Sequence, residues 1–125
     1  MRQSFLKEIM YQRNNIFAKI LRGEIPCDVV YEDEKVLFFY DINPQAKIHI
    51  LGIPKMEVFN FVDFVSQADK EMVNHFFSKT NDIIREKKIE KSGFKIITNN
   101  GENGGQEVLH FHIHILGGEK LNNIS

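Results

Sequence analysis

The sequence predicts an α+β protein in which one long helix packs on an antiparallel sheet of about five strands. Three observations indicate this class. Short runs rich in β-branched and aromatic residues recur between polar turns, which is typical of strands. The turns between neighbouring runs are short, whereas parallel neighbours need a crossover of about a dozen residues or more. One long stretch repeats its apolar residues with the period of an α-helix.

A short helix is the first expected element, at residues 16–23. Asn14 and Asn15 precede it and can accept hydrogen bonds from its first N–H groups. Arg22 falls in the last turn, and Gly23 is placed to end the helix. We therefore predict an N-terminal extension at 1–13 and a single domain at 14–125.

Three strands are expected next, at residues 29–33, 35–41 and 48–54. A polar turn joins the first two, so we expect them to form a hairpin. Pro44 then interrupts the pattern, because it disfavours helix at the residue before it. The third strand closes at Pro54.

The long helix is predicted to begin at Ser66, with Asp69 three residues later as in a capping box. Acidic residues lie early in it and basic residues late, as the helix dipole favours. Gly93 would end it. Its apolar residues share one face: Met72, Val73, Phe76, Phe77, Ile83 and Ile84.

Two further strands are expected, at residues 94–99 and 108–116, joined by the glycine-rich loop "NGENGGQE". A sheet of this size has edges that must be protected from aggregation. Pairing with a second copy of the chain would protect one of them, so we expect the sheet to extend across a homodimer.

Composition excludes several classes of function. The chain has 125 residues, enough for one core, and a net charge of −1, so it lacks the basic field that attracts nucleic acid or an anionic membrane. A single cysteine, Cys27, excludes an internal disulfide and a four-cysteine zinc site. We find no apolar run typical of a signal peptide or a membrane span, and predict a cytoplasmic protein.

The stretch "LHFHIHILGG" places histidines at every second position within the last predicted strand. Side chains alternate between the two faces of a strand, so His110, His112 and His114 share one face. The other face is apolar and belongs on the core. Three histidines in strict alternation are hard to explain by packing alone, which leaves a metal or a phosphate as their ligand.

A metal fits this spacing less well than a phosphate does. Alternate strand positions lie ~6.6–6.8 Å apart, whereas one zinc ion holds its nitrogen ligands within ~2.1 Å. Three histidines of one strand would be strained around it, so zinc would need a helper such as His49 or a carboxylate. The glycine-rich loop can instead point N–H groups at an anion, and the histidines can supply a nucleophile and a proton donor on one face.

The motif "HFHIHIL" matches the His-φ-His-φ-His-φ-φ pattern (φ, apolar) of the histidine triad (HIT) superfamily of nucleotide hydrolases and transferases. From Ile16 onward the chain resembles the Hint branch, the nucleoside phosphoramidases, in two long segments. These are "IFAKILRGEIPCDVVYEDEKVLFFYDINPQAKIHILGIPK" and "NNGENGGQEVLHFHIHILGG". The resemblance implies a HIT-like homodimer that hydrolyses purine nucleoside 5′-phosphoramidates, such as adenosine 5′-monophosphoramidate or aminoacyl-adenylates. It implies a covalent nucleotidyl-histidine and neither a metal nor a cofactor.

The resemblance also assigns roles to the histidines. His112 would attack the α-phosphorus, and His114 would contact the phosphate and help to protonate the departing amine. His110 would organise the site by hydrogen bonding, with support from His49. The spacing alone does not distinguish these roles. His75 lies away from any motif and is expected to be partly exposed structure.

The substrate-binding residues follow from the same resemblance. Asp41, with Ile42 beside it, would hold the ribose hydroxyls, and Asn99 would bind the phosphate with the backbone of Gly105, Gln106 and Glu107. The base would lie between three apolar side chains: Ile25, Phe39 and Leu51. Taken by themselves, Asp41 and Asn99 are equally typical of turns, and the apolar residues of a core.

Two departures from the family bear on specificity. Some Hint members have serine where this chain has Glu107, and the tail "EKLNNIS" is short, without the Trp and Pro of some relatives. Three other functions stay open. They are a dinucleoside polyphosphate (Ap3A or Ap4A) hydrolase of the same superfamily, a purine-nucleotide-binding or scaffold module with little turnover, and a metal-dependent enzyme.

Overall fold

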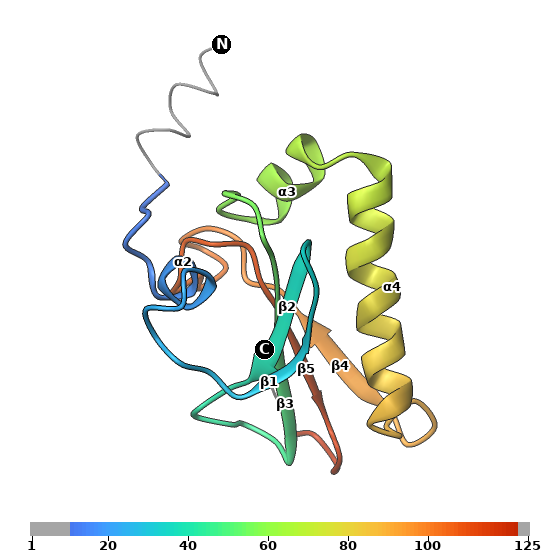
Figure 1. The fold of residues 1–125 in the computed structure, drawn as a ribbon. Helices are drawn as coiled ribbons and strands as arrows, with labels where there is room; N and C mark the ends of the chain where they lie inside the picture. Colours follow the sequence, from blue (N-terminus) through green and yellow to red (C-terminus); the bar gives the residue numbers. More distant parts are fainter. Residues whose placement is uncertain (1–10, 123–125) are drawn as a thin grey trace.

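The computed structural model describes residues 11–122. Residues 1–10, most of the predicted N-terminal extension, lie outside this range. The elements follow in the order α2 (Ile16–Leu21), β1 (Val29–Glu32), β2 (Val36–Tyr40), β3 (Ile48–Pro54), α3 (Phe61–Gln67), α4 (Lys70–Glu86), β4 (Phe94–Ile97) and β5 (Ile113–Gly117) (Figure 1). No helix in the described range is long and apolar enough to cross a membrane.

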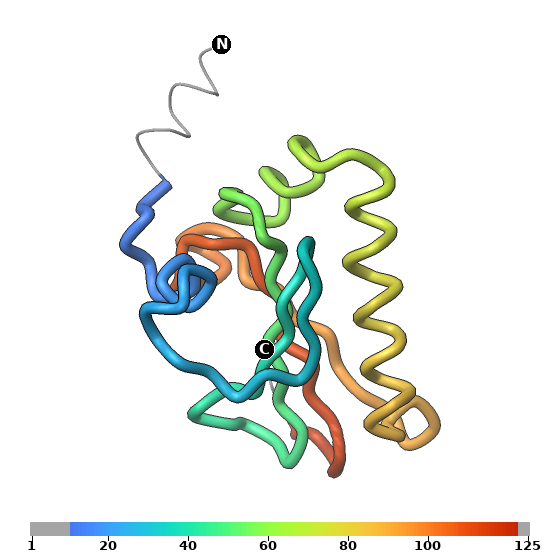
Figure 2. The backbone as a smooth tube through the Cα atoms, in the orientation of Figure 1, coloured from blue at the N-terminus to red at the C-terminus, as the bar shows by residue number. Residues whose placement is uncertain are grey.

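The strands form one five-stranded sheet in the order β1-β2-β3-β5-β4, and every neighbouring pair is antiparallel. The first three strands make a meander that can be followed along the tube in Figure 2. β5 inserts between β3 and β4, so the histidine strand lies inside the sheet rather than at its edge. The predicted α+β class and antiparallel sheet are confirmed.

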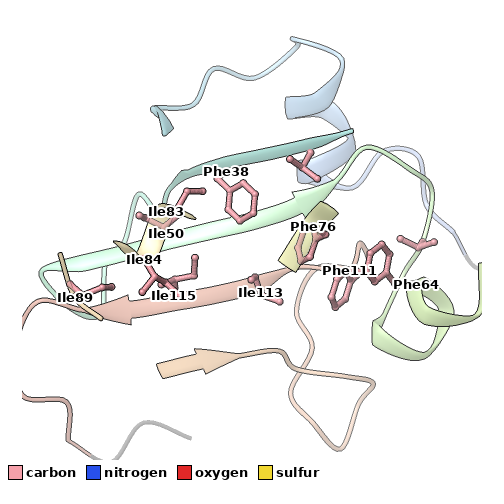
Figure 3. Packing of buried hydrophobic residues seen from close by; sticks show 12 residues of the cluster. Phe38, Ile50, Phe64, Phe76, Ile83, Ile84, Ile89, Phe111, Ile113 and Ile115 are labelled. Atoms are coloured by element: carbon pink, nitrogen blue, oxygen red, sulfur yellow. The ribbon is translucent and has the colours of Figure 1, made fainter. Parts of the chain in front are cut away.

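One face of the sheet packs against α4 (Figure 3). Phe76, Ile83 and Ile84 of the helix are buried in the same cluster as Phe38 and Ile50 of the sheet. Burying side chains of this size stabilises a fold by about 1.5–3 kcal/mol each. This layer is the main core, and it includes Ile113 and Ile115 on the α4-facing side of β5.

The opposite face of the sheet packs against α2. Phe17 from the helix joins Leu37, Phe39, Leu51 and Ile53 in a second buried cluster. The predicted N-cap is confirmed at Asn15, whose side chain accepts from the Ala18 N–H at 2.9 Å. A cavity opens on this face, with Phe17 of α2 in its wall.

The predicted bounds of the long helix were wrong. Ser66 lies inside the separate helix α3, and Asp69 is itself the N-cap of α4, accepting from the Met72 N–H at 2.7 Å. The helix then ends at Glu86, before Lys88 turns to a positive φ of 61°, rather than at Gly93. Gly93 ends only the following turn. The structure uses two N-caps, Asn60 for α3 and Asp69 for α4, and Ser66 is neither of them.

The last strand is also shorter than the predicted 108–116. β5 begins at Ile113, because the chain before it hydrogen-bonds elsewhere. Pro54 ends β3 and has no N–H to donate. The Phe111 N–H donates to the Val58 carbonyl at 2.8 Å, and the Thr98 hydroxyl donates to the His112 carbonyl at 2.7 Å. His110 and His112 therefore lie before β5, where their rings contact the Phe17 ring of α2.

Candidate active site

A cavity of about 370 Å³ opens on the α2 side of the sheet. It brings together residues from α2, β3, β5 and the glycine-rich loop, far apart in sequence. Its walls are Phe17, Asp41, Asn43, Gln45, His49, Leu51, Asn99, Gly105, Glu107, Val108, His112 and His114. Eight of the residues predicted for the site are among them: Asp41, His49, Leu51, Asn99, Gly105, Glu107, His112 and His114.

His112 has one ring nitrogen engaged and one available. Its Nδ1 lies 2.7 Å from the His110 carbonyl oxygen, which can only accept, so Nδ1 carries the proton. The Nε2 of the neutral ring then holds a lone pair. Burial lowers the pKa of His112, which favours this neutral form, and the Phe17 ring meets the imidazole edge-on, with centroids 4.9 Å apart. His112 therefore presents an unprotonated ring nitrogen.

A chain of hydrogen bonds sets the tautomer of His114. The Gln45 N–H donates to His49 Nδ1 at 3.0 Å, so the proton of neutral His49 is on Nε2. That Nε2–H donates to His114 Nδ1 at 2.9 Å, which leaves the proton of His114 on its own Nε2. Burial, followed by the neighbouring His112 and His49, lowers the pKa of His114 to about 4. His114 is therefore a neutral N–H donor in the cavity wall.

Asp41 follows β2 and supplies the carboxylate of the cavity. One oxygen accepts from the Asn43 N–H at 2.8 Å, and the other lies 3.4 Å from His49 Nε2. Within the described range, Asp41, His49 and His114 are the group whose ligand atoms lie close enough together, within 4.8 Å, to hold a metal ion. His49 and His114 of this group are also joined by the hydrogen bond that sets the His114 tautomer.

His110 lies behind the cavity rather than in its wall. It is 1% exposed, and its Nε2–H donates to the Pro54 carbonyl at 3.0 Å. Its Nδ1 is 2.7 Å from the Tyr11 hydroxyl. Burial lowers the pKa of His110 to about 4, so the ring stays neutral. The first histidine of the motif therefore supports the second.

The glycine-rich loop is held together by Gln106. The Gln106 amide donates to the carbonyls of Phe59 and Val108, and its side-chain oxygen accepts from the Gly101 N–H at 2.9 Å. The N–H groups of Gly105 and Gln106 are also used within the loop. Among the described residues the Glu107 N–H has no acceptor, so it is available to donate. Gln106 shapes the loop and does not line the cavity.

Three predicted apolar contacts lie outside the cavity wall. Phe39 is buried in the cluster beneath it, Ile25 is half-buried elsewhere, and Ile42 is 85% exposed. Phe17 lies in the wall instead, beside Leu51. Asn99 lies in the cavity wall, and its amide donates to the Gly104 carbonyl at 2.8 Å.

Comparison with known proteins identifies the family of this chain. The model of the HIT domain matches residues 22–121. The chain belongs to the HIT domain family. An uncharacterized HIT-like protein of Rickettsia prowazekii is 47% identical over 112 residues, 90% of this chain and 93% of the relative. The purine nucleoside phosphoramidase of Escherichia coli is 42% identical over 106 residues, 85% of this chain and 88% of the relative.

Solved structures share this HIT fold. A histidine triad protein from Clostridium difficile has 47% sequence identity and a TM-score of 0.79, over 93% of this chain and all of its own. A HIT family hydrolase from Legionella pneumophila has 38% identity and a TM-score of 0.81, over 87% of this chain and 96% of its own. The five-stranded antiparallel sheet is therefore the sheet of HIT proteins.

Sequence reasoning missed three residues that matter to this HIT site. Phe17 was part of a predicted helix, and its wall position depends on where α2 docks. Gln45 contributes its backbone N–H, which donates to His49 Nδ1, and the type of residue does not predict a backbone contact. Tyr11 was placed in the N-terminal extension, outside the domain, and it reaches His110 across a separation of 99 residues.

Proposed function

We propose that this HIT protein is a nucleoside phosphoramidase, which hydrolyses the P–N bond of purine nucleoside 5′-phosphoramidates. The observation that carries the proposal is the tautomer of His112. Its Nδ1–H is held by the His110 carbonyl at 2.7 Å, so the ring offers Nε2 as a nucleophile at the cavity. The purine nucleoside phosphoramidase of Escherichia coli, 42% identical, supports the choice of reaction.

In the first step His112 Nε2 attacks the α-phosphorus and the P–N bond to the amine breaks. The amine leaves with the bonding pair and takes up one proton from solvent in the cavity, while the His114 Nε2–H donates a hydrogen bond to the departing nitrogen. The His112 ring becomes a nucleotidylated cation whose Nδ1–H remains on the His110 carbonyl. In the second step water attacks phosphorus, the bond to His112 breaks with its electron pair returning to Nε2, and the water proton passes to solvent.

The remaining wall residues fit a nucleotide. The Asp41 carboxylate can accept hydrogen bonds from both ribose hydroxyls, and the Glu107 N–H can donate to the phosphate. Phe17 and Leu51 offer an apolar surface to the purine. The Glu107 side chain would repel a phosphate, so we assign binding to its backbone.

We also propose that the working form is a homodimer joined at β4. This strand lies at one edge of the sheet and exposes Phe94 by 39% and Ile96 by 45%. Apolar side chains on an unpaired edge favour pairing with another strand. A second copy of the chain would continue the sheet and cover both residues.

The decisive experiment measures AMP release from adenosine 5′-phosphoramidate in EDTA by the intact protein and by His112→Ala. His75→Asn is the matched control, because His75 lies outside the cavity and contacts Asp33. We expect release by the intact protein and the control, and a loss of about a thousandfold or more in His112→Ala. If His112→Ala releases AMP as fast as the intact protein, His112 is not the nucleophile.

The other functions give different results in the same assay. Release that requires an added metal would indicate a metal-dependent enzyme. Faster cleavage of Ap4A than of the phosphoramidate would indicate a dinucleoside polyphosphate hydrolase. AMP binding with no turnover of either compound would indicate a nucleotide-binding module.

A further inference from the structure

Tyr11 ties the segment before α2 to the histidine triad. Its side chain is only 8% exposed, and its ring meets the His110 ring edge-on with centroids 5.9 Å apart. The Tyr11 hydroxyl lies 2.7 Å from His110 Nδ1. This is a buried contact between residues 99 positions apart, so it forms only when the N-terminal segment docks on the site.

The direction of this hydrogen bond follows from the other side of the His110 ring. The Pro54 carbonyl at 3.0 Å can only accept, so His110 Nε2 carries the ring proton and Nδ1 is an acceptor. The Tyr11 hydroxyl must therefore donate to Nδ1. Burial raises the pKa of Tyr11, which keeps the hydroxyl protonated and able to donate.

The backbone of the same residue orients the nucleophile. The His110 carbonyl accepts the Nδ1–H of His112 at 2.7 Å. The His110 ring is fixed at both nitrogens, by Tyr11 on one side and Pro54 on the other, and this anchors the peptide whose carbonyl holds His112. His110 thus connects Tyr11, which does not line the cavity, to His112.

The segment that carries Tyr11 is held in place by its own contacts. The Arg22 guanidinium donates to the Arg13 carbonyl at 2.7 Å, and the Asn15 amide donates to the Gln12 carbonyl at 2.7 Å. Arg13 also pairs with Glu57 at 2.8 Å, but this exposed pair contributes little. The backbone contacts present the Tyr11 side chain to the interior.

The hydroxyl of Tyr11 has no substitute at this position. Among the described residues, every buried side-chain nitrogen and oxygen has a hydrogen-bond partner. Removing the hydroxyl would leave His110 Nδ1 as a buried acceptor without a partner, which destabilises this arrangement. We expect the His110 ring to move in response. Any movement of His110 is passed to His112 through the shared carbonyl.

We propose that Tyr11 is a positioning residue of the active site, whose hydroxyl locks His110 and thereby aligns His112 for attack. The segment at residues 11–13 then belongs to the catalytic domain. The effect on catalysis rests on the proposed phosphoramidase function, whereas the hydrogen bond and its effect on the two histidines do not.

The first test compares Tyr11→Phe with Tyr31→Phe. Both variants keep the ring and lose one hydroxyl hydrogen bond, because the Tyr31 hydroxyl donates to Asp33 at 2.8 Å, away from the cavity. We expect kcat to fall about ten- to a hundredfold in Tyr11→Phe with little change in KM, since misplacing a reacting group slows the reaction. Tyr31→Phe should keep both constants. An equal kcat in the two variants overturns the proposal.

The second test reads the histidine rings directly, by long-range ¹⁵N–¹H NMR. In the intact protein we expect His110 to be protonated at Nε2 alone and His112 at Nδ1 alone. In Tyr11→Phe the signals of both rings should shift or broaden, while Tyr31→Phe leaves them unchanged. A His110 protonated at Nδ1 in the intact protein overturns the proposal without any variant. If no protein turns over the phosphoramidate but the rings respond as expected, the proposed function fails and the Tyr11 hydrogen bond stands.

Discussion

The Nε2 nitrogen of His49 lies 2.9 Å from the Nδ1 nitrogen of His114 and joins the two central strands at the cavity. His49 on β3 is paired with Leu116, two residues beyond His114 on β5, so the two histidines are diagonal neighbours on one face. Because the Gln45 N–H occupies the other nitrogen of His49, this contact has only one direction. His49 donates, and His114 keeps its proton for the cavity.

Replacing His49 should therefore disable His114 without removing it. In His49→Ala the His114 ring loses the partner that sets its tautomer. We expect kcat to fall about ten- to a hundredfold, which is less than the roughly ten-thousandfold that general acid catalysis can contribute. His49→Asn, whose amide can still donate, should recover part of the loss. Steady-state kinetics on adenosine 5′-phosphoramidate test this, and equal rates in His49→Ala and the intact protein would show that His114 needs no such partner.

The buried His110 should make the fold less stable in mild acid. Its pKa is lowered to about 4 by burial, whereas in the unfolded chain it is near the ordinary value of about 6.5. Between these pH values the unfolded chain binds a proton that the folded protein excludes, so stability is complete above about pH 6.5 and falls as the pH drops toward 4. The loss attributable to His110 is on the order of 3 kcal/mol.

Urea unfolding at pH 7 and at pH 4.5 measures this dependence. The His110→Gln variant removes the titrating ring, so its stability should change less between the two pH values, although it is lower at pH 7. If His110→Gln keeps the full pH dependence of the intact protein, the effect comes from other groups, of which His112 and His114 are the first to consider.

Much of the histidine strand was predictable, because alternation of side chains is a local property. His114 does lie on the opposite face from Ile113 and Ile115, which are buried against α4. The start of β5 was not predictable, since it depends on Pro54 having no N–H and on Val58 capturing the Phe111 N–H. Both partners are remote in sequence.

The bounds of the helices and the side chains that line the cavity depend on tertiary packing for a related reason. Asn60 and Asp69 are each a good N-cap, and only the packed structure decides that both are used. Likewise Phe17 and Phe39 both lie in the second cluster, but only Phe17 reaches the cavity. Residue type indicates which side chains are buried, whereas tertiary packing selects those that meet a ligand.

Asp33 should stabilise the first hairpin without affecting catalysis. Burial alone would raise its pKa, but hydrogen bonds from the Lys35 N–H, Tyr31, His75 and the Val36 N–H hold it far below the ordinary range. A carboxyl with a lowered pKa stabilises the fold above its unfolded value of about 3.9 and loses this contribution as the pH falls.

The Asp33→Ala variant should therefore unfold more easily at neutral pH, by about 1–3 kcal/mol, because buried or partly buried donors lose an ionised acceptor. The difference from the intact protein should shrink below pH 3. Phosphoramidase activity at neutral pH should be unchanged, since Asp33 does not line the cavity. Urea titrations at both pH values, together with the activity assay, check each part, and a large loss of activity would connect this hairpin to the site.

The proposed β4 interface makes the final prediction. A lysine at Ile96 would place a charge on the edge strand, where it would be buried between two copies, so Ile96→Lys should dissociate the dimer. Val62→Lys is the matched control, because Val62 is an exposed apolar residue of α3, at 62%. Sedimentation equilibrium should find the intact protein and Val62→Lys as dimers and Ile96→Lys as a folded monomer. An intact protein that sediments as a monomer would rule out the β4 interface. If Ile96→Lys is still a dimer, the two copies meet at another surface.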